Sequence, residues 1–206
     1  MADSYLKAPF FKPLGLAEGI YRVGPLARLN VCDHISTPLA DAELQEMRER
    51  LGPVVQSSFH NHYARLIEAL YGLERMKELL EDPRILDAKV RAHAGVNDLE
   101  GVGIIEAPRG TLIHHYKVND DGAMTWANLI VATGHNNLAI RRGVHDVATK
   151  FINGNQIEEG AVNRVSALVR AFDPCLSCST HQFGMAAVRL QLRGPDGEVL
   201  DEKGTV

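Results

Sequence analysis

The chain has 206 residues, of which 45% are hydrophobic and 23% are charged, and its formal net charge at pH 7 is −4. Such a chain is long enough for one domain or two small ones of the soluble globular class, and its acidic balance argues against nucleic acid as a partner. Its three cysteines cannot all pair, and it contains neither a signal peptide nor an apolar run of membrane-spanning length, so we expect a cytoplasmic protein without membrane contact.

The first 83 residues are predicted to be irregular and then helical. Residues 1–25 are rich in proline and glycine, which favours an irregular connection. A short polar helix is predicted over residues 41–50, and apolar side chains at helical spacing predict a longer one over residues 58–80. The second helix should end near Asp82, because the residue before a proline disfavours helical geometry.

The middle of the chain predicts strands, and later residues predict helices and a hairpin. The string GVGIIEAPRGTLIHHY (101–116) indicates two short strands around a loop, and KVNDDG (117–122) is typical of a hairpin turn. Asn136 or Asn137 is expected to cap a helix that ends near Phe151, and apolar spacing over residues 162–172 predicts another. Residues 188–200 read as a β-hairpin. The predicted fold class is mainly α with short β elements, an α+β fold rather than a Rossmann sheet.

Two thiols and an imidazole follow the last predicted helix at three-residue intervals: Cys175, Cys178 and His181. Thiolates are soft ligands for nickel, iron and zinc, and a two-residue gap lets both sulfurs face one ion. One CxxC supplies only half of a four-coordinate site. By itself it fits zinc binding or redox chemistry as well. The third cysteine, Cys32, is expected to be a buried structural thiol.

Four strings, in this order, resemble the C-terminal part of the large subunit of nickel-iron hydrogenases: YRVGPLARLN (21–30), EAPRGTLIHHY (106–116), NLIVATGHNN (128–137) and DPCLSCSTH (173–181). The GHNN variant and the long tail look most like the cytoplasmic, bidirectional, NAD-linked branch. The resemblance implies the helical core of that subunit, incomplete at the N-terminus. Residues 1–181 would belong to the large-subunit domain, and residues 182–206 would form a removable maturation extension.

The resemblance also implies metal ligands. Cys175 would bind nickel terminally, and Cys178 would bridge nickel to an iron that carries CO and CN ligands. Pro108, Arg109 and Thr133 would line the pocket around those diatomic ligands. His181, with the backbone carbonyl of Leu129, would hold a magnesium or similar ion.

Two further residues receive roles from the resemblance. Arg109 would lie beside the open metal site, where dihydrogen is split. Because the pKa of arginine exceeds about 12, an electrostatic role is favoured over a general-base role. Asp173 would pair with that guanidinium and orient it.

Partners follow from the same resemblance. The chain would be the catalytic subunit of an enzyme that reversibly oxidises H2, and electrons would pass to an iron-sulfur small subunit, because this chain lacks the cysteines to hold clusters. Since it has no GxGxxG loop, NAD would bind to diaphorase subunits. A maturation endopeptidase would cut after His181, which makes the sequence a precursor.

One departure from the family pattern is large. Family members carry a second CxxC near their N-terminus, whereas Cys32 is the only other cysteine here. The chain therefore lacks two thiolate ligands and should be inactive alone, as a fragment that needs a complementing piece. The alternative is a non-catalytic remnant or a zinc-binding structural domain.

Overall fold

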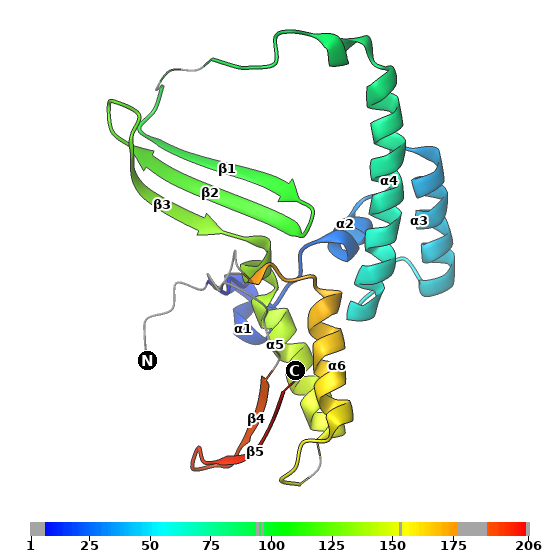
Figure 1. Ribbon diagram of the computed structural model, residues 1–206, viewed down its shortest axis with the longest axis vertical. Coiled ribbons are helices and arrows are strands. Elements are labelled where there is room, and N and C mark those ends of the chain that lie inside the picture. Colours follow the sequence, from blue (N-terminus) through cyan, green and yellow to red (C-terminus); the bar gives the residue numbers. More distant parts are fainter. Residues whose placement is uncertain (1–6, 94, 96, 153, 177–188, 205–206) are drawn as a thin grey trace. The chain divides into compact units, whose positions relative to one another are not determined.

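The computed structural model describes residues 7–93, 95, 97–152, 154–176 and 189–204. The chain forms two compact units (Figure 1). The middle unit is Gly24–Ile130, and the terminal unit combines Met1–Val23 with Val131–Val206. Helices hold more of the described residues than strands do, so the mainly helical α+β class is confirmed. In the described part of the chain, each helix is too short or too polar to serve as a membrane span.

The middle unit begins with three α-helices: α2 (Pro25–Val31), α3 (Pro38–Leu51) and α4 (Asn61–Glu81). Short 3-10 turns, η2 (Ser58–His60) and η3 (Pro83–Leu86), lie at the two ends of α4. Both α2 and α3 start with proline, whose fixed φ suits the first helical position and whose missing N–H costs nothing there. The predicted end of the long helix near Asp82 is confirmed.

The core of the middle unit lies among these three helices, which pack side by side (Figure 1). Burying one leucine-sized side chain there contributes about 1.5–3 kcal/mol. The buried residues are Leu26, Leu29, Ala40, Leu44, Met47, Val55, Ala64 and Ile67. Apolar residues in the second half of α4 are exposed instead, among them Leu73 and Leu80 at 61% and 72%.

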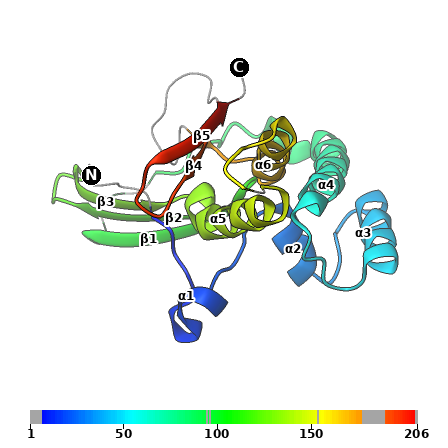
Figure 2. The same cartoon turned by 90° about the horizontal axis from the view of Figure 1, so that it is seen from below.

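Strands β1 (Glu100–Ala107), β2 (Gly110–Val118) and β3 (Met124–Ile130) form an antiparallel sheet in that order (Figure 2). In register, Ala107 pairs with Gly110 across a turn that contains only Pro108 and Arg109. The hairpin turn predicted over residues 117–122 is confirmed, and the Asn119 side chain accepts the Ala123 N–H there at 2.8 Å. Two or more short strands are predicted between residues 101 and 128, and the strand that follows this turn, β3, begins inside that region and ends at Ile130.

The terminal unit contains η1 (Lys12–Leu14), α1 (Gly15–Glu18), α5 (Ala132–Phe151), α6 (Glu159–Ala171), β4 (Arg189–Arg193) and β5 (Val199–Gly204). The predicted hairpin and the predicted ends of both long helices are confirmed. The predicted cap is wrong: α5 starts at Ala132, so Asn136 and Asn137 lie inside the helix. The physical reason is that the Asn136 side chain forms hydrogen bonds with the backbone of Val23 instead of capping the helix.

Helices α5 and α6 lie side by side (Figures 1 and 2). A glycine makes this close approach possible, because a Cβ on Gly143 would lie only 2.7 Å from Cδ2 of Leu168. The β4–β5 hairpin packs near the start of α6, with Leu190 and Leu192 against the buried cluster of Ile157, Ala161 and Val162.

One carboxylate joins the hairpin to this helix pair. The Oδ2 atom of Asp201 in β5 accepts the N–H of buried Ile157 at 2.6 Å, and Oδ1 accepts the Glu202 N–H at 2.8 Å. The Ile157 hydrogen bond is the main reason that the pKa of Asp201 is lowered. The folded state therefore favours the charged carboxylate. Its stabilising contribution is complete above the ordinary pKa of about 3.9 and is lost as pH falls through the lowered pKa.

We expect Asp201→Asn to loosen the hairpin at neutral pH, because a neutral amide is a weaker acceptor than a carboxylate. The Ile157 amide should then exchange with deuterium about threefold faster or more, as followed by NMR. In the wild type, the same loss of protection should appear only in acid. Asp196→Asn, at an exposed position in the β4–β5 turn, is the matched control. Wild-type exchange at Ile157 in the Asp201 variant would contradict the proposed contact.

Candidate metal centre

The segment before the CxxC motif makes a sharp end to α6. Phe172 is buried, and its N–H still bonds to Val169 O at 3.1 Å. Asp173 then adopts a left-handed conformation, with φ at +49°. Short polar side chains tolerate this region better than bulky ones. Helix α6 therefore ends at Ala171, and the chain turns at Asp173, two residues before Cys175.

Cys175 is held against the first turn of α5. Its N–H donates to Oγ1 of Thr133 at 2.9 Å, and both residues are half-buried. This contact brings together two residues that the sequence places 42 positions apart. Cys175 is disulfide-bonded in this structure, so it would have to be reduced before its sulfur could bind a metal.

The first turn of α5 is itself fixed by the segment that precedes the middle unit. The buried Asn136 side chain accepts the Val23 N–H at 2.9 Å and donates to Val23 O at 3.1 Å. Tyr21 Oη lies 2.6 Å from Nδ1 of His135, and burial raises the pKa of Tyr21. A Cβ on Gly134 would lie 3.0 Å from Lys7 O. These contacts hold the first turn of α5, which carries Thr133, against the N-terminal segment of the chain.

Pro108 and Arg109 lie in the middle unit, at the tip of the β1–β2 hairpin, and both are exposed. We call residues 107–110 the arginine turn. Gly110 closes it with φ at +133°, a conformation that glycine adopts without strain. The carboxylate of Glu106, just before the turn, accepts hydrogen bonds from Thr111 and Arg28.

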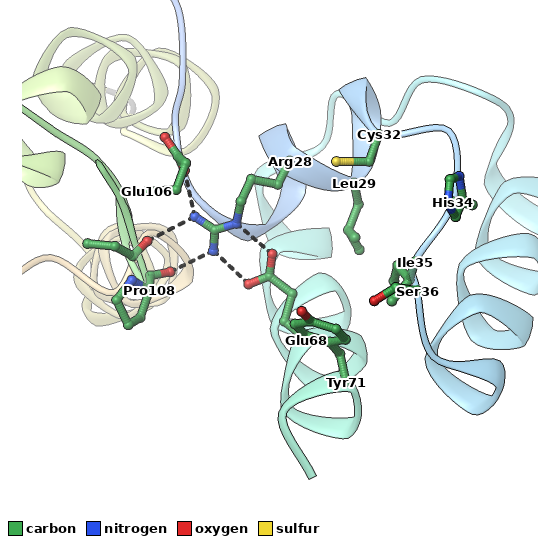
Figure 3. A pocket seen from close by; sticks show the side chains of 11 residues that line it. Arg28, Leu29, Cys32, His34, Ile35, Ser36, Glu68, Tyr71, Glu106 and Pro108 are labelled. Carbon is green, nitrogen blue, oxygen red and sulfur yellow. Dashed lines mark hydrogen bonds and ion pairs between the residues drawn. The ribbon is translucent and has the colours of Figure 1, made fainter. Parts of the chain in front are cut away.

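A pocket of about 700 Å³ lies beside the arginine turn, between the turn and helices α2 and α4 (Figure 3). Arg28 points into the space between Glu68 and Glu106, and its Nη1 atom lies 2.9 Å from Oε2 of Glu106. Burial disfavours the charged guanidinium, but hydrogen bonds with Glu68 and Glu106 outweigh this, so the pKa of Arg28 is raised. Arg28 is therefore a permanent cation at this edge of the pocket. Its role was not predicted, and its place in the string YRVGPLARLN is the signal that could have marked it.

Cys32 also lines this pocket, and the expectation that it is buried is wrong. Helix α2 ends at Val31, so Cys32 follows it with extended backbone, past the face that carries Leu26 and Leu29 into the core. It is exposed.

Of the remaining predicted site residues, the structure describes only Leu129. Leu129 lies in β3, opposite His114, and is 43% exposed. Cys178 and His181 lie outside the described residues, as does the predicted cleavage point after His181. Among the described residues, no group of three or more His, Cys, Asp or Glu side chains is placed to hold a metal ion.

The two adjacent histidines of β2 face opposite sides of the sheet, as strand alternation predicts. His114 bonds through Nδ1 to Tyr116 Oη at 2.6 Å. His115 bonds through Nε2 to Glu100 at 2.7 Å and meets the Trp126 ring edge-on. Their side chains are thus occupied by partners on two different faces.

This fold occurs in solved hydrogenases. It matches a crystal structure of an NAD+-reducing [NiFe]-hydrogenase in the H2-reduced state with a TM-score of 0.79 and 46% identity, over 88% of this chain and 40% of that chain. A [NiFeSe] hydrogenase from Desulfovibrio vulgaris Hildenborough matches with a TM-score of 0.58 and 25% identity, over 86% of this chain and 38% of that one. The architecture is therefore that of a hydrogenase subunit.

Sequence comparison gives the family. A sequence model described as nickel-dependent hydrogenase matches residues 2–181, and the chain belongs to this family. The β subunit of the NAD-reducing hydrogenase HoxS from Cupriavidus necator is 41% identical over 97% of this chain and 42% of the relative. A chain of the vhc F420-non-reducing hydrogenase from Methanococcus voltae is 44% identical over 88% of this chain and 39% of that relative. The present chain thus spans about two fifths of the length of these relatives.

Proposed function

We propose that this chain supplies the C-terminal metal-binding part of a nickel-iron hydrogenase catalytic subunit, which reversibly oxidises H2 to protons and electrons. The observation that carries the proposal is the hydrogen bond between Cys175 and Thr133. It joins the string DPCLSCSTH to the string NLIVATGHNN, inside the segment that matches the family.

The donor set fits the proposed metals. Cys175 and Cys178 would supply two thiolates, the soft ligands that nickel and iron accept. When bound, the nickel-iron pair, with CO and CN on the iron, would supply the site at which H2 is split. The other two thiolates of the family pattern have to come from outside these 206 residues, because Cys32 is the only remaining cysteine and lies in the middle unit.

The chain's own residues would shape the surroundings of this centre. Pro108, Arg109 and Thr133 would line the pocket for the diatomic ligands, with Arg109 as a fixed positive charge. Asp173 would pair with the Arg109 guanidinium and keep its orientation. His181 and the carbonyl of Leu129 would hold a magnesium or similar ion as a structural site.

The relatives' names support a set of partners. Electrons would pass first to an iron-sulfur small subunit, then through diaphorase subunits to NAD, because one relative is a subunit of an NAD-reducing hydrogenase. A maturation endopeptidase would remove residues 182–206 by cutting after His181. We place the assembly in the cytoplasm.

A metal analysis tests this function. The full chain is produced anaerobically with nickel-iron maturation proteins, with and without a polypeptide that covers the remaining length of the relatives. We expect about one nickel per chain, infrared bands of iron-bound CO and CN, and H2-dependent dye reduction in the complemented sample. Zinc in place of nickel in both samples, without those bands, would overturn the proposal in favour of a zinc-binding remnant.

A further inference from the structure

The string YRVGPLARLN contains a side chain whose contacts converge on the arginine turn. Arg28 of α2 makes five hydrogen bonds (Figure 3). Nε and Nη2 donate to the two carboxylate oxygens of Glu68, at 2.7 and 2.6 Å. Nη1 donates to Ala107 O at 3.0 Å and Nη2 to Pro108 O at 2.8 Å. The fifth bond goes to Glu106.

The two ends of this contact set differ in how they are supported. Glu68 stands on α4 next to Ile67, which is 1% exposed and belongs to the core of the middle unit. The two parallel hydrogen bonds between Glu68 and Arg28 fix the plane of the guanidinium, because the carboxylate and the guanidinium are both planar groups. The other end consists of main-chain carbonyls in an exposed two-residue turn. Arg28 therefore ties an exposed turn to a helix of the core.

A second contact from the same string reaches the arginine turn. Gly24, four residues before Arg28, has φ at +109°, and a Cβ there would lie 2.9 Å from the carbonyl oxygen of Arg109. Only glycine combines this φ with such a close backbone approach at low cost. The main chain of Arg109 thus rests against Gly24, while the carbonyls of the two preceding residues bond to Arg28.

We infer that Arg28 is a positioning residue for Arg109. By donating hydrogen bonds to the carbonyls of Ala107 and Pro108, it fixes the position of the Arg109 backbone and therefore of the atom from which its side chain extends. An ion pair with Glu68 would need no main-chain partner, yet two of the five bonds go to the main chain of the turn. The catalytic consequence rests on the proposed function, because only there does Arg109 have a task. A misplacement of about 1 Å can reduce a catalytic rate about 100-fold.

The test compares two arginine-to-lysine variants. Arg28→Lys keeps the charge and the pairing with Glu68 but lacks the fork that reaches both carbonyls. Arg48→Lys is the matched control, because Arg48 also donates to main-chain carbonyls of the middle unit, at Leu29, Cys32 and Asp33, none of which belongs to the arginine turn. Deuterium uptake of the peptide 106–112 should become about threefold faster in the Arg28 variant and stay unchanged in the control.

A kinetic measurement gives the second readout. In the metal-loaded, complemented enzyme, Arg28→Lys should lower kcat for H2 oxidation about 10-fold or more, with little change in KM or nickel content. If Arg28→Lys does not fold, Glu68→Gln replaces it, with a smaller effect of the same kind expected on both readouts. The inference is overturned if the Arg28 variant takes up deuterium in peptide 106–112 at the wild-type rate. It is also overturned if uptake becomes faster but kcat keeps its wild-type value. A wild type without nickel or activity overturns the proposed function and the catalytic role with it, while uptake alone still decides whether Arg28 holds the turn.

Discussion

Replacing Cys175 with serine is expected to abolish stable nickel binding and to lower H2 oxidation by about 10³-fold or more. Serine presents a hard oxygen that stays protonated at neutral pH, whereas a soft metal needs a thiolate. When several residues form one catalytic site, removing a single member can cost nearly as much activity as removing all of them. Nickel per chain and H2-dependent dye reduction in the complemented enzyme measure the two effects.

The structure offers controls for this variant. The bond to Thr133 uses the main-chain N–H of Cys175, so the serine variant retains it. When both proteins are reduced, so that neither has the disulfide of Cys175, the variant should unfold at a denaturant concentration close to that of the wild type. Cys32→Ser changes an exposed cysteine in the middle unit and should leave nickel content unchanged. Full nickel content in the Cys175 variant would exclude this residue as a ligand.

Local patterns predicted the elements whose determinants are local. The helix before Asp82-Pro83 ends where proline geometry requires, and the turn after Lys117 forms from its own Asn and Gly residues. The start of α5 could not be predicted in this way. Asn136 is a good capping residue by type, but its partner is Val23, 113 residues away.

Burial was harder to predict than helicity. The apolar spacing along α4 correctly indicates a helix, yet Leu66 is 69% exposed while its neighbour Ile67 is 1% exposed. Periodicity identifies a face that can be covered, and only tertiary contacts determine how much of it is. Cys32 illustrates the same limit, since free cysteine is often buried and this one is not.

The candidate site was predictable only in part. The chemistry of the CxxC motif left zinc, redox and nickel-iron chemistry open, and the resemblance to a family chose among them. Thr133 and Cys175 are in contact, and their assignment to one metal centre stays a prediction. The bonds of Arg28 to the arginine turn span up to 80 residues, and no spacing rule predicts such a contact.

The charge of Arg109 is the feature on which its proposed role depends. Arg109 is exposed, so its replacement leaves no cavity in the core. Arg109→Lys keeps a positive charge but loses the planar fork, and Arg109→Met loses both. If the role is electrostatic, H2 oxidation should fall about 10-fold or more in the first variant and about 10²–10³-fold in the second.

The pH dependence of the lysine variant separates the electrostatic role from a general-base role. The pKa of an ordinary lysine is about 10.4, so raising the pH from 8 toward 10 begins to remove its proton, whereas arginine keeps its own. With an electrostatic role, the variant should lose activity over this range relative to the wild type, because the charge disappears. With a base role, it should gain activity, because the free amine is the base. Rates of H2 oxidation measured across this range in the complemented enzymes decide between the two, and a gain in the lysine variant would contradict the electrostatic assignment.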